Sequence, residues 1–277
     1  MEFKNMIKLD FFCPLWGSDH LPFEAFLEKV KETGYDGVEM SFPLEEPVRE
    51  TLVGLIQKYG LKLIAQHWET IDSDFETHKK NYERRLRNLA ATQPLFINSQ
   101  TGKDYYSYQQ NAELFEIAAM VADETGINTI HETHRGKFSF AAHVTKNYLD
   151  RLPNLELCLD ISHWCCVAET FLDDQKEAVD LAIDRTRHIH SRVGFTEGPQ
   201  VMDPQADENT AIVTTHIRWW QEVVDSIKGK GFDSLTITPE FGAPPYLQLM
   251  PYTQEPIYSQ WDANVYMMHL LKRKLNL

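Results

Sequence analysis

His188-Ile189-His190-Ser191-Arg192 is the stretch of this chain that says most about its fold. It has the length of one strand, and a strand turns alternate side chains to the same face. His188, His190 and Arg192 therefore share a face. A core strand rarely turns two imidazoles and a guanidinium inward unless they have partners or a chemical role. We expect a buried strand whose inner face belongs to a functional site.

Three acidic residues elsewhere in the chain each close an apolar run of strand length. The runs are residues 128–132, 155–160 and 234–240, and they end at Glu132, Asp160 and Glu240. Together with residues 188–192 they would form four neighbouring strands. Adjacent strands lie about 4.8 Å apart, so side chains at matching strand ends can converge on one point. We therefore expect Glu132, Asp160, His190 and Glu240 to form a single site.

Strand-like runs recur along the whole chain at intervals of roughly 30 residues, the length of one β/α unit. They begin near Lys8, Asp36, Lys62, Pro94, Asn128, Glu156, Arg187 and Ser234. Between them lie amphipathic segments. Four of these, residues 21–33, 47–59, 108–125 and 219–230, are each followed by a glycine, which is typical of a helix end. Eight strand–helix units of this kind predict an α/β fold, a (β/α)8 TIM barrel.

The alternative fold is an open, doubly wound parallel sheet. It is disfavoured because no glycine-rich phosphate-binding turn follows the first strand. The last interval is longer than the others, and we expect residues 194–216 to form a long loop after the seventh strand. In a barrel this loop would lie at the C-terminal face, where active sites are built.

The chain has 277 residues, enough for one large barrel or two small domains. No Gly/Ser tract, Pro-rich stretch or charge block marks a linker, so we expect one domain over residues 1–277. No apolar run approaches the roughly 20 residues of a membrane span. The N-terminus lacks the apolar segment of a signal peptide. We expect a cytoplasmic protein without membrane contact.

The charge and the cysteines exclude further classes of protein. A net charge of −14 disfavours nucleic acid as a partner, because a phosphate backbone requires a basic surface. The 4 cysteines contain no Cys-x-x-Cys pair, so we expect neither a zinc–thiolate site nor a disulfide framework.

Glu132, Asp160, His190 and Glu240 are candidate metal ligands. Three carboxylates and one imidazole suit a hard or borderline divalent ion: Mn, Mg, Co or Zn. The alternative is that each acid caps the following helix or pairs with an arginine. That explanation is ordinary for one acid, but weaker for four ligand-competent residues at matching strand ends.

Further polar residues near the strand ends are candidates for binding hydroxyl groups. His163 follows Asp160 by three positions, His67 ends the third strand, and Asn98 and Gln100 lie on the fourth. All can donate or accept hydrogen bonds, and each could equally be a satisfied buried polar residue. Glu39 ends the second strand, where pairing with an arginine is as plausible as catalysis.

Short motifs resemble the xylose isomerase-like TIM-barrel superfamily, which includes sugar epimerases, dehydratases and endonuclease IV. The chain is also similar to proteins grouped as sugar phosphate isomerases/epimerases. The motifs span nearly the whole chain in the expected order. They are Gly34-Tyr-Asp-Gly-Val-Glu39, Glu132-Thr-His134, Asp160-Ile-Ser-His163-Trp164, His188-Ile-His190 and Pro239-Glu-Phe-Gly242.

The resemblance implies that Glu132, Asp160, His190 and Glu240 bind the ion and that Glu132 and Glu240 also act as the acid/base pair. It implies that His163 and Arg192 contact substrate oxygens. Arg192 departs from the epimerase pattern, in which the corresponding arginine lies further beyond the metal histidine. Family members are often homodimers, and residues 246–258 could form a subunit contact or a lid.

The function expected on this basis is a metal-dependent sugar or sugar phosphate isomerase/epimerase. The metal would stabilise the enediolate formed when a proton leaves the carbon next to a carbonyl. Arg135, Lys137 and Arg192 could bind a phosphate. The alternatives are a metal-dependent dehydratase, lyase or hydrolase on the same barrel, and a sugar-binding barrel without catalysis.

Overall fold

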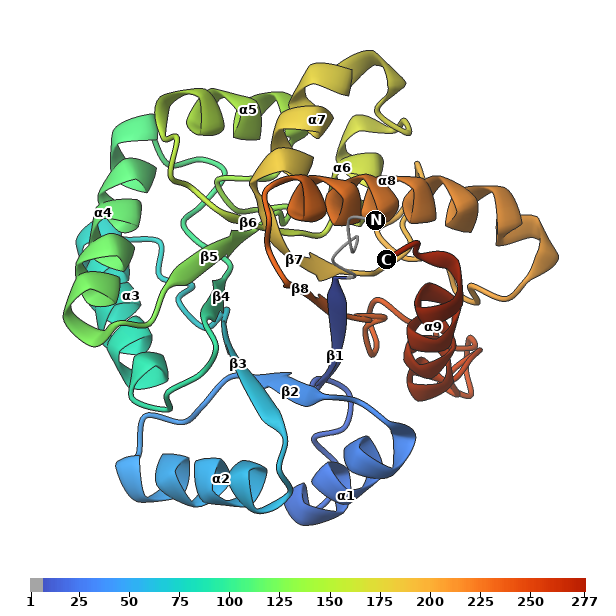
Figure 1. The fold of residues 1–277 in the computed structure, drawn as a ribbon, viewed down its shortest axis with the longest axis horizontal. Coiled ribbons are helices and arrows are strands. Elements are labelled where there is room, and N and C mark those ends of the chain that lie inside the picture. Colours follow the sequence, from blue (N-terminus) through green and yellow to red (C-terminus); the bar gives the residue numbers. More distant parts are fainter. Residues whose placement is uncertain (1–6) are drawn as a thin grey trace, which may run out of the picture.

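A computed structural model describes residues 7–277, which fold into a closed barrel of parallel strands (Figure 1). Each strand pairs with its neighbours in chain order, and β1 pairs with β8 to close the barrel. The predicted (β/α)8 barrel is confirmed. The strands are β1 (Lys8–Pro14), β2 (Gly37–Met40), β3 (Lys62–His67), β4 (Ile97–Ser99), β5 (Thr129–Glu132), β6 (Leu157–Leu159), β7 (Thr186–His190) and β8 (Ser234–Thr238).

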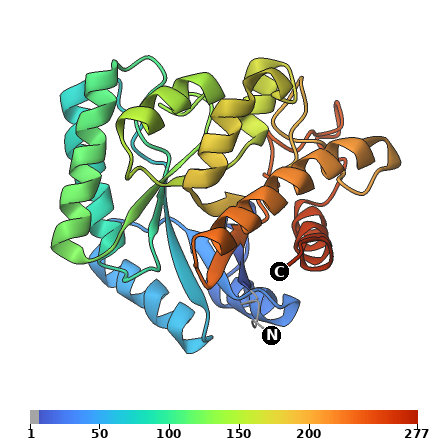
Figure 2. The ribbon, with the colours of Figure 1, turned by 45° about the horizontal axis from the view of Figure 1, so that its top comes forward.

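Helices surround the strands (Figure 2). They are α1 (Phe23–Thr33), α2 (Glu46–Lys58), α3 (Phe75–Ala90), α4 (Tyr108–Thr125), α5 (Ala142–Arg151), α6 (Ser162–Ala168), α7 (Lys176–Arg185), α8 (Thr210–Gly229) and α9 (Gln260–Lys274), with 3-10 turns η1 (Asp173–Gln175) and η2 (Asp207–Asn209). The glycines predicted to end α1 and α4 do so: Gly34 and Gly126 have left-handed backbones, with φ of 87° and 75°. Within residues 7–277 we find no helix long and apolar enough to cross a bilayer.

The prediction of a loop over residues 194–216 is wrong for residues 210–216, which belong to helix α8. Helix α8 begins at Thr210 rather than at Trp219. The start was hidden because residues 210–215 are rich in Thr, Ile and Val, which have low helix propensity. Packing stabilises this first part of α8, since Val213 and His216 are buried. His216 Nε2 also accepts a hydrogen bond from the Gly194 amide at 3.2 Å, which ties α8 to the loop before it.

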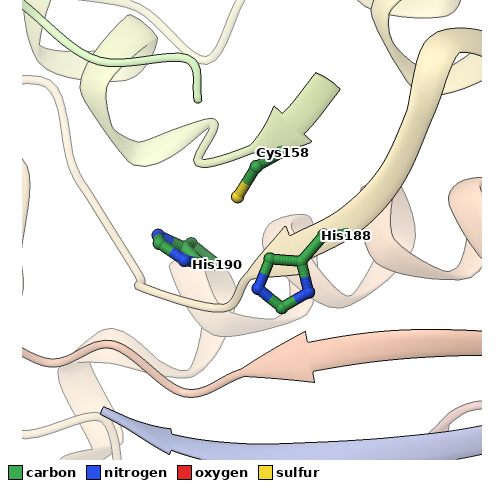
Figure 3. Close-up of side chains that lie close together, drawn as sticks. All are labelled: Cys158, His188 and His190. Carbon is green, nitrogen blue, oxygen red and sulfur yellow. The ribbon is translucent and has the colours of Figure 1, made fainter. Parts of the chain in front are cut away.

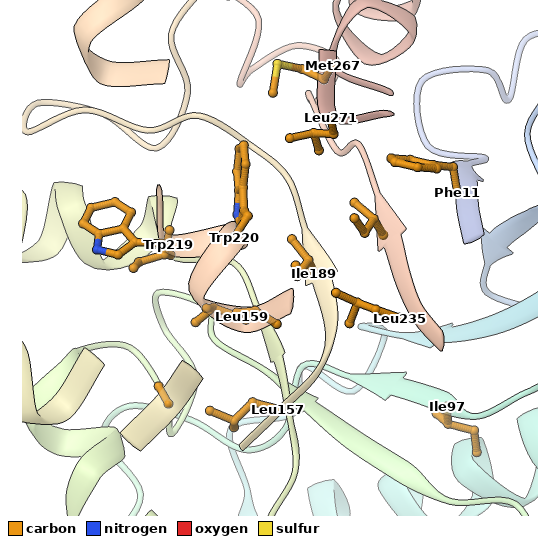
Figure 4. Packing of buried hydrophobic residues seen from close by; sticks show 14 of the residues in the cluster. Phe11, Ile97, Leu157, Leu159, Ile189, Trp219, Trp220, Leu235, Met267 and Leu271 are labelled. Atoms are coloured by element: carbon orange, nitrogen blue, oxygen red, sulfur yellow. The ribbon is translucent and has the colours of Figure 1, made fainter. Parts of the chain in front are cut away.

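The main apolar core lies between the strands and the helices. Strand residues that face outward pack against the buried faces of the helices, as the alternation of a strand requires. Around β7 and β8 this shell consists of Ile189, Leu235, Trp219, Trp220, Met267 and Leu271, seen from close by in Figure 4.

The interior of the barrel is different from this shell. Phe12, Ile64 and Ile130 are buried but do not belong to the connected shell cluster. Towards the C-terminal ends of the strands the inward side chains become polar: Glu39, Gln66, Asn98, Glu132, His188, His190 and Thr238, all buried. A barrel interior is usually filled by branched apolar residues, so this polar layer marks the functional end.

Candidate metal centre and active site

The structure brings Glu132, Asp160, His190 and Glu240 together. Glu132 and His190 are the last residues of β5 and β7, and Asp160 directly follows β6. Glu240 lies just beyond β8. One potential ligand atom from each residue lies within 4.8 Å of the others, and all four residues are buried. Strand ends at the same edge of the barrel account for the convergence.

The contacts of His190 are unusual for an imidazole beside carboxylates. Its Nδ1 atom lies 2.8 Å from Glu240 Oε2 and 3.8 Å from Glu132 Oε1. Yet Nδ1 makes no hydrogen bond to any residue in the described range 7–277, although it is fully buried. Atoms that lie close together without hydrogen-bond geometry are expected where ligands converge on a common ion.

The carboxylates are crowded in a dry environment. Burial, together with the charges of Glu240 and Asp160, raises the pKa of Glu132 to about 8, against the attraction of His190. Burial also raises the pKa of Asp160, although Arg192 opposes the shift. For Glu240, burial is outweighed by His190 and Arg192, which lower its pKa to about 2. The cluster thus holds more acids than its own cations neutralise.

Arg192 supplies part of the missing positive charge. Its Nε donates to Asp160 Oδ2 at 3.1 Å, and its Nη2 donates to Glu240 Oε2. The third nitrogen, Nη1, is buried and has no hydrogen-bond partner among residues 7–277. The guanidinium also packs over the Tyr246 ring, 4.4 Å from its centre. Arg192 therefore lies beside Asp160 and Glu240 and keeps one donor nitrogen without a partner among residues 7–277.

These residues fit a divalent cation. Carboxylate oxygens and an imidazole nitrogen are the ligand types that Mg, Mn, Co and Zn accept. The unpartnered Nδ1 of His190 and the excess of buried negative charge are both features that a cation would satisfy. Glu132, Asp160, His190 and Glu240 are the residues that would hold it.

Glu132, Asp160, His190 and Glu240 are called the ligand set below. A second layer of polar residues lies beneath them, towards the N-terminal ends of the strands. Glu39 accepts hydrogen bonds from Asn98 Nδ2 at 2.8 Å and from Thr238 Oγ1 at 2.5 Å, and it lies 3.0 Å from His190 Nε2 and 3.1 Å from His188 Nε2. The expected pairing of Glu39 with an arginine is wrong: its partners among residues 7–277 are the two imidazoles, Asn98 and Thr238. Burial opposes ionisation of Glu39, but His190 and His188 outweigh it and hold its pKa well below the usual value.

A thiol completes the surroundings of the two histidines. Cys158, on β6, points towards the rings of His188 and His190 (Figure 3). Potential ligand atoms of the three residues lie within 4.8 Å of one another. Burial raises the pKa of the Cys158 thiol well above its usual value, so the sulfur is protonated.

A cavity of about 400 Å³ lies over the ligand set at the C-terminal end of the barrel. Glu240 and Arg192 reach its wall, as do Gln66 and Gln100. The two glutamines contact the acids: Gln66 Nε2 donates to Glu240 Oε1 at 3.1 Å, and Gln100 Nε2 to Glu132 Oε1 at 3.4 Å. The remaining wall is formed by Leu15, Trp16, Asp19, Met40, Ser41, Trp68, His134 and Tyr246.

Two residues predicted to bind substrate are placed away from this cavity. Both ring nitrogens of His67 have partners, Ser99 Oγ at 2.9 Å and Thr70 Oγ1 at 2.7 Å. The side chain turns towards α3, because its neighbour Gln66 takes the inward position of β3. Asn98 is inside the barrel, but it donates to Glu39 below the ligand set.

His163 lies beside the ligand set, buried behind the cavity wall. Its Nε2 is 3.5 Å from Asp160 Oδ2 and has no hydrogen-bond partner among residues 7–277. Its Nδ1 lies 3.2 Å from Nη1 of Arg135. Burial and the neighbouring His134 and arginines keep the pKa of His163 well below its usual value, so the ring is neutral.

Sequence reasoning missed the roles of Gln66, Trp68 and Tyr246. Tyr246 belongs to the segment 246–258, and its ring packs edge-on against Trp16 with centres 5.2 Å apart. Arg135 lies over the same tyrosine ring at 4.7 Å. No motif distinguishes these residues in the sequence. Gln66 reaches the cavity because even-numbered residues of β3 point into the barrel, and Tyr246 reaches it because the chain after β8 passes over the barrel end.

The backbone next to Glu240 is fixed by the last helix. Asn264, on α9, accepts a hydrogen bond from the Phe241 amide at 2.7 Å and donates one to the Phe241 carbonyl at 3.1 Å. Asn264 is buried. The position of Glu240 therefore depends on the docking of α9.

Residues 27–258 match the model of the xylose isomerase-like TIM barrel family. The match covers most of the chain and agrees with the observed barrel. The chain therefore belongs to this family. No curated protein matches the chain significantly.

Several solved structures share the fold. A 3-keto-D-glucoside 4-epimerase from Escherichia coli has 14% identity and a TM-score of 0.61, over 96% of this chain and 99% of that one. A probable 3-DHS dehydratase from Bacillus anthracis has 15% identity and a TM-score of 0.59, over 96% and 100%. A xylose isomerase-like TIM barrel protein from Mycobacterium smegmatis in complex with magnesium has 10% identity and a TM-score of 0.62, over 96% and 98%. At these identities the likeness shows the fold alone.

Proposed function

We propose that this protein is a divalent-metal-dependent isomerase or epimerase of a sugar or sugar phosphate. The observation that carries the proposal is the convergence of Glu132, Asp160, His190 and Glu240 within 4.8 Å, buried beneath a cavity of about 400 Å³. Pockets of this size hold small molecules. Family membership supports a sugar as the substrate class.

The four residues would hold the ion. When bound, a divalent ion polarises a substrate carbonyl and stabilises the negative charge that develops on its oxygen. Three carboxylates without a cation would repel one another, which is why the raised pKa values of Glu132 and Asp160 support this assignment.

Glu240 and Glu132 are the proposed acid/base pair. Glu240 reaches the cavity wall and is held ionised by His190 and Arg192, as a proton acceptor must be. Glu132 comes from β5, a different part of the barrel wall from Glu240, which follows β8. Carboxyl groups on different parts of the wall can act on different faces of a bound substrate. One removes the proton next to the carbonyl, and the other returns a proton to the opposite face or to the adjacent carbon.

Arg192 and His163 are the proposed contacts to substrate oxygens. Arg192 Nη1 and His163 Nε2 are both buried and unpartnered within residues 7–277, and both side chains adjoin Asp160. Substrate oxygens would complete their hydrogen bonds. Trp16, Trp68 and Tyr246 offer apolar faces against which the carbon-bound hydrogens of a sugar can pack.

The first test is hydrogen exchange in deuterated water with a panel of ketoses, followed by mass spectrometry. Glu240→Gln keeps the shape of the side chain but removes the base, so exchange at the carbon next to the carbonyl should be lost. Glu156→Gln is the control, because Glu156 pairs with Arg187 outside the site. Exchange that survives Glu240→Gln at the wild-type rate would exclude the proposed proton transfer.

The second test concerns the ion. Protein treated with a chelator should lose activity and regain it with Mn or Mg. Titration calorimetry should show binding of either ion to the stripped wild type and much weaker binding to His190→Ala, which lacks the only nitrogen ligand of the set. Failure of the stripped wild type to bind Mn, Mg, Co or Zn would exclude the metal centre.

Dehydration is the second candidate reaction. It starts with the same proton abstraction, but a hydroxyl group then leaves as water and must be protonated. Glu132 is the proposed partner of Glu240 for this proton transfer as well. A product lighter than the substrate by one water distinguishes this reaction from isomerisation, in which the mass is unchanged.

A further inference from the structure

Glu39 is the most completely bonded acid in the barrel. It is only 1% exposed, and four side chains surround its two oxygens. Oε1 lies 2.8 Å from Asn98 Nδ2 and 3.0 Å from His190 Nε2. Oε2 lies 2.5 Å from Thr238 Oγ1 and 3.1 Å from His188 Nε2. A carboxylate accepts about four hydrogen bonds, so Glu39 has no lone pair left for an ion or a substrate.

An ionised carboxylate can only accept hydrogen bonds, so each of these neighbours must donate. His188 donates from Nε2 as a neutral ring when its Nδ1 accepts from Thr236 Oγ1 at 2.8 Å; the Thr236 carbonyl, 3.0 Å from the same nitrogen, would instead accept from a protonated Nδ1. His190 donates from Nε2. Its remaining nitrogen, Nδ1, faces Glu132 and Glu240. When an ion takes the place of a proton on Nδ1, the proton that Glu39 holds on Nε2 leaves Nδ1 as the atom that offers a lone pair.

We propose that Glu39 is a positioning residue that fixes the proton of His190 on Nε2 and so aims the Nδ1 lone pair at the metal centre. This inference rests on the metal centre of the proposed function. Ligating histidines commonly donate their second N–H to a carboxylate, which orients the ring and makes it a better ligand. Glu39 does this from across the barrel, since it lies on β2 and His190 on β7.

The arrangement also explains why the polar layer exists. Glu39 links β2 to β4 through Asn98, to β7 through both histidines and to β8 through Thr238. A ring held from one side only could rotate about its Cβ–Cγ bond. Thr238 and Asn98 fix the carboxylate, and the carboxylate fixes the ring. Within residues 7–277, both oxygens of Glu39 have partners, whereas Asn98 Oδ1 and His190 Nδ1 are buried without one.

The competing possibility is a second metal site formed by Cys158, His188 and His190, whose side chains face one another in Figure 3. Such a site would need His190 Nε2 and one nitrogen of His188 as ligands. In the structure His190 Nε2 and His188 Nε2 both lie within 3.1 Å of Glu39, and His188 Nδ1 is engaged by Thr236. The Glu39 network and a second metal site therefore exclude each other, and one experiment can decide between them.

The first experiment uses the wild-type chain labelled with ¹⁵N-histidine. Long-range ¹H–¹⁵N correlation spectra, assigned with His190→Asn, report which ring nitrogens carry protons. We expect a proton on His190 Nε2 in the metal-free protein and in the Zn-loaded protein alike. A His190 Nε2 without a proton in either state would overturn the proposal. The result is read from the wild-type protein, and His190→Asn is the only variant that has to fold, because it serves to assign the His190 signals.

The second experiment is a titration of chelator-treated protein with Zn alone. Glu39→Gln keeps the size of the side chain but replaces one acceptor oxygen by an NH2 group, and we expect about 10- to 100-fold weaker binding. Asp10→Asn is the matched control, because Asp10 is a buried strand acid paired with Lys8 and Lys62, away from the ligand set. It should bind Zn like the wild type.

The outcomes separate the two proposals. Equal Zn affinity of Glu39→Gln and wild type, or two Zn ions bound per wild-type chain, would overturn the role of Glu39. A wild type that binds no Zn, Mn, Mg or Co would exclude the proposed metal centre. In that case the position of the His190 proton still decides whether Glu39 fixes the ring.

Discussion

The two faces of β7 make a direct comparison between two regions of this molecule. Ile189 points outward into the apolar shell, where it is buried with Trp220. His188 and His190, on either side of it, point inward to Glu39 and the acids. The outer face contributes buried apolar area to the shell. The inner face contributes polar side chains to the candidate site. Adjacent residues of one strand thus separate stability from function.

This separation predicts opposite effects of substitutions on the two faces. Inner residues should change activity more than the free energy of unfolding. Outer residues should change the free energy of unfolding while leaving the folded protein active.

The largest effect is expected for Glu132→Gln on the inner face. Loss of a general acid/base group lowers turnover by about 10²- to 10⁴-fold. The free energy of unfolding should not fall, because burial already disfavours the charged form of Glu132, and glutamine is neutral and similar in size. Turnover and urea denaturation, measured on the same preparation, check both parts. A large loss of stability would show that the two faces are not separable.

On the outer face, Trp220→Ala should cost about 3–5 kcal/mol of unfolding free energy, because the ring is fully buried in the shell. The folded variant should still bind the metal with wild-type affinity. Trp68→Ala is the counterpart, since Trp68 is 50% exposed on the cavity wall. It should cost far less stability and weaken substrate binding instead. Calorimetric unfolding and metal titration of both variants provide the comparison.

His216 lies where the shell meets the loop after β7, and it should make stability depend on pH. Burial lowers its pKa to about 4, against about 6.5 in an unfolded chain. The unfolded state therefore binds more protons between these values, and stability falls as pH drops below about 6.5, by at most about 1.4 kcal/mol per pH unit. Above pH 7 this contribution is fully present.

The measurement is urea denaturation of wild type and His216→Gln at pH 7 and pH 5. The variant should lose less stability on acidification than the wild type, because it lacks this group. Parallel losses in the two proteins would mean that His216 does not titrate with unfolding.

The smallest effect is expected outside both regions. Tyr252 is fully exposed at the tip of the segment 246–258 and has φ of 67°, a conformation that asparagine tolerates better than tyrosine. Tyr252→Asn should change the free energy of unfolding by less than about 0.5 kcal/mol. Turnover should stay within twofold. A marked loss of turnover would indicate that this tip closes over the cavity.

Much of the fold could be predicted because strand and helix periods differ and glycines end the helices. The eight strands begin close to the predicted runs, and β5 ends at Glu132 as predicted, whereas β7 ends at His190 and leaves Ser191 and Arg192 beyond the strand. The start of α8 could not be predicted, because its first residues favour strands locally and become helical through packing.

The candidate site was predictable only in part. A charged or imidazole side chain at the end of an apolar run is unusual and is visible in the sequence, so Glu132, Asp160, His190 and Glu240 could be predicted. Polar residues within short strands do not show which face they take. For β3 the choice between Gln66 and His67 depends on one step of register, and the structure turns Gln66 inward. The partners of Glu39 come from β4, β7 and β8, and no local pattern can reveal them.

Asn264 on α9 clamps the backbone beside Glu240, and the other three residues of the ligand set come from β5, β6 and β7. On a ribosome Glu132 is made near the midpoint of the chain and the other three later, and Glu240 is anchored only after the last helix has been made. The first strands can pair earlier, but the barrel closes only when β8 reaches β1. A nascent chain would therefore carry these residues without bringing them together. Under the proposed function, an ion would be bound only at the end of folding, and truncated chains would not hold it.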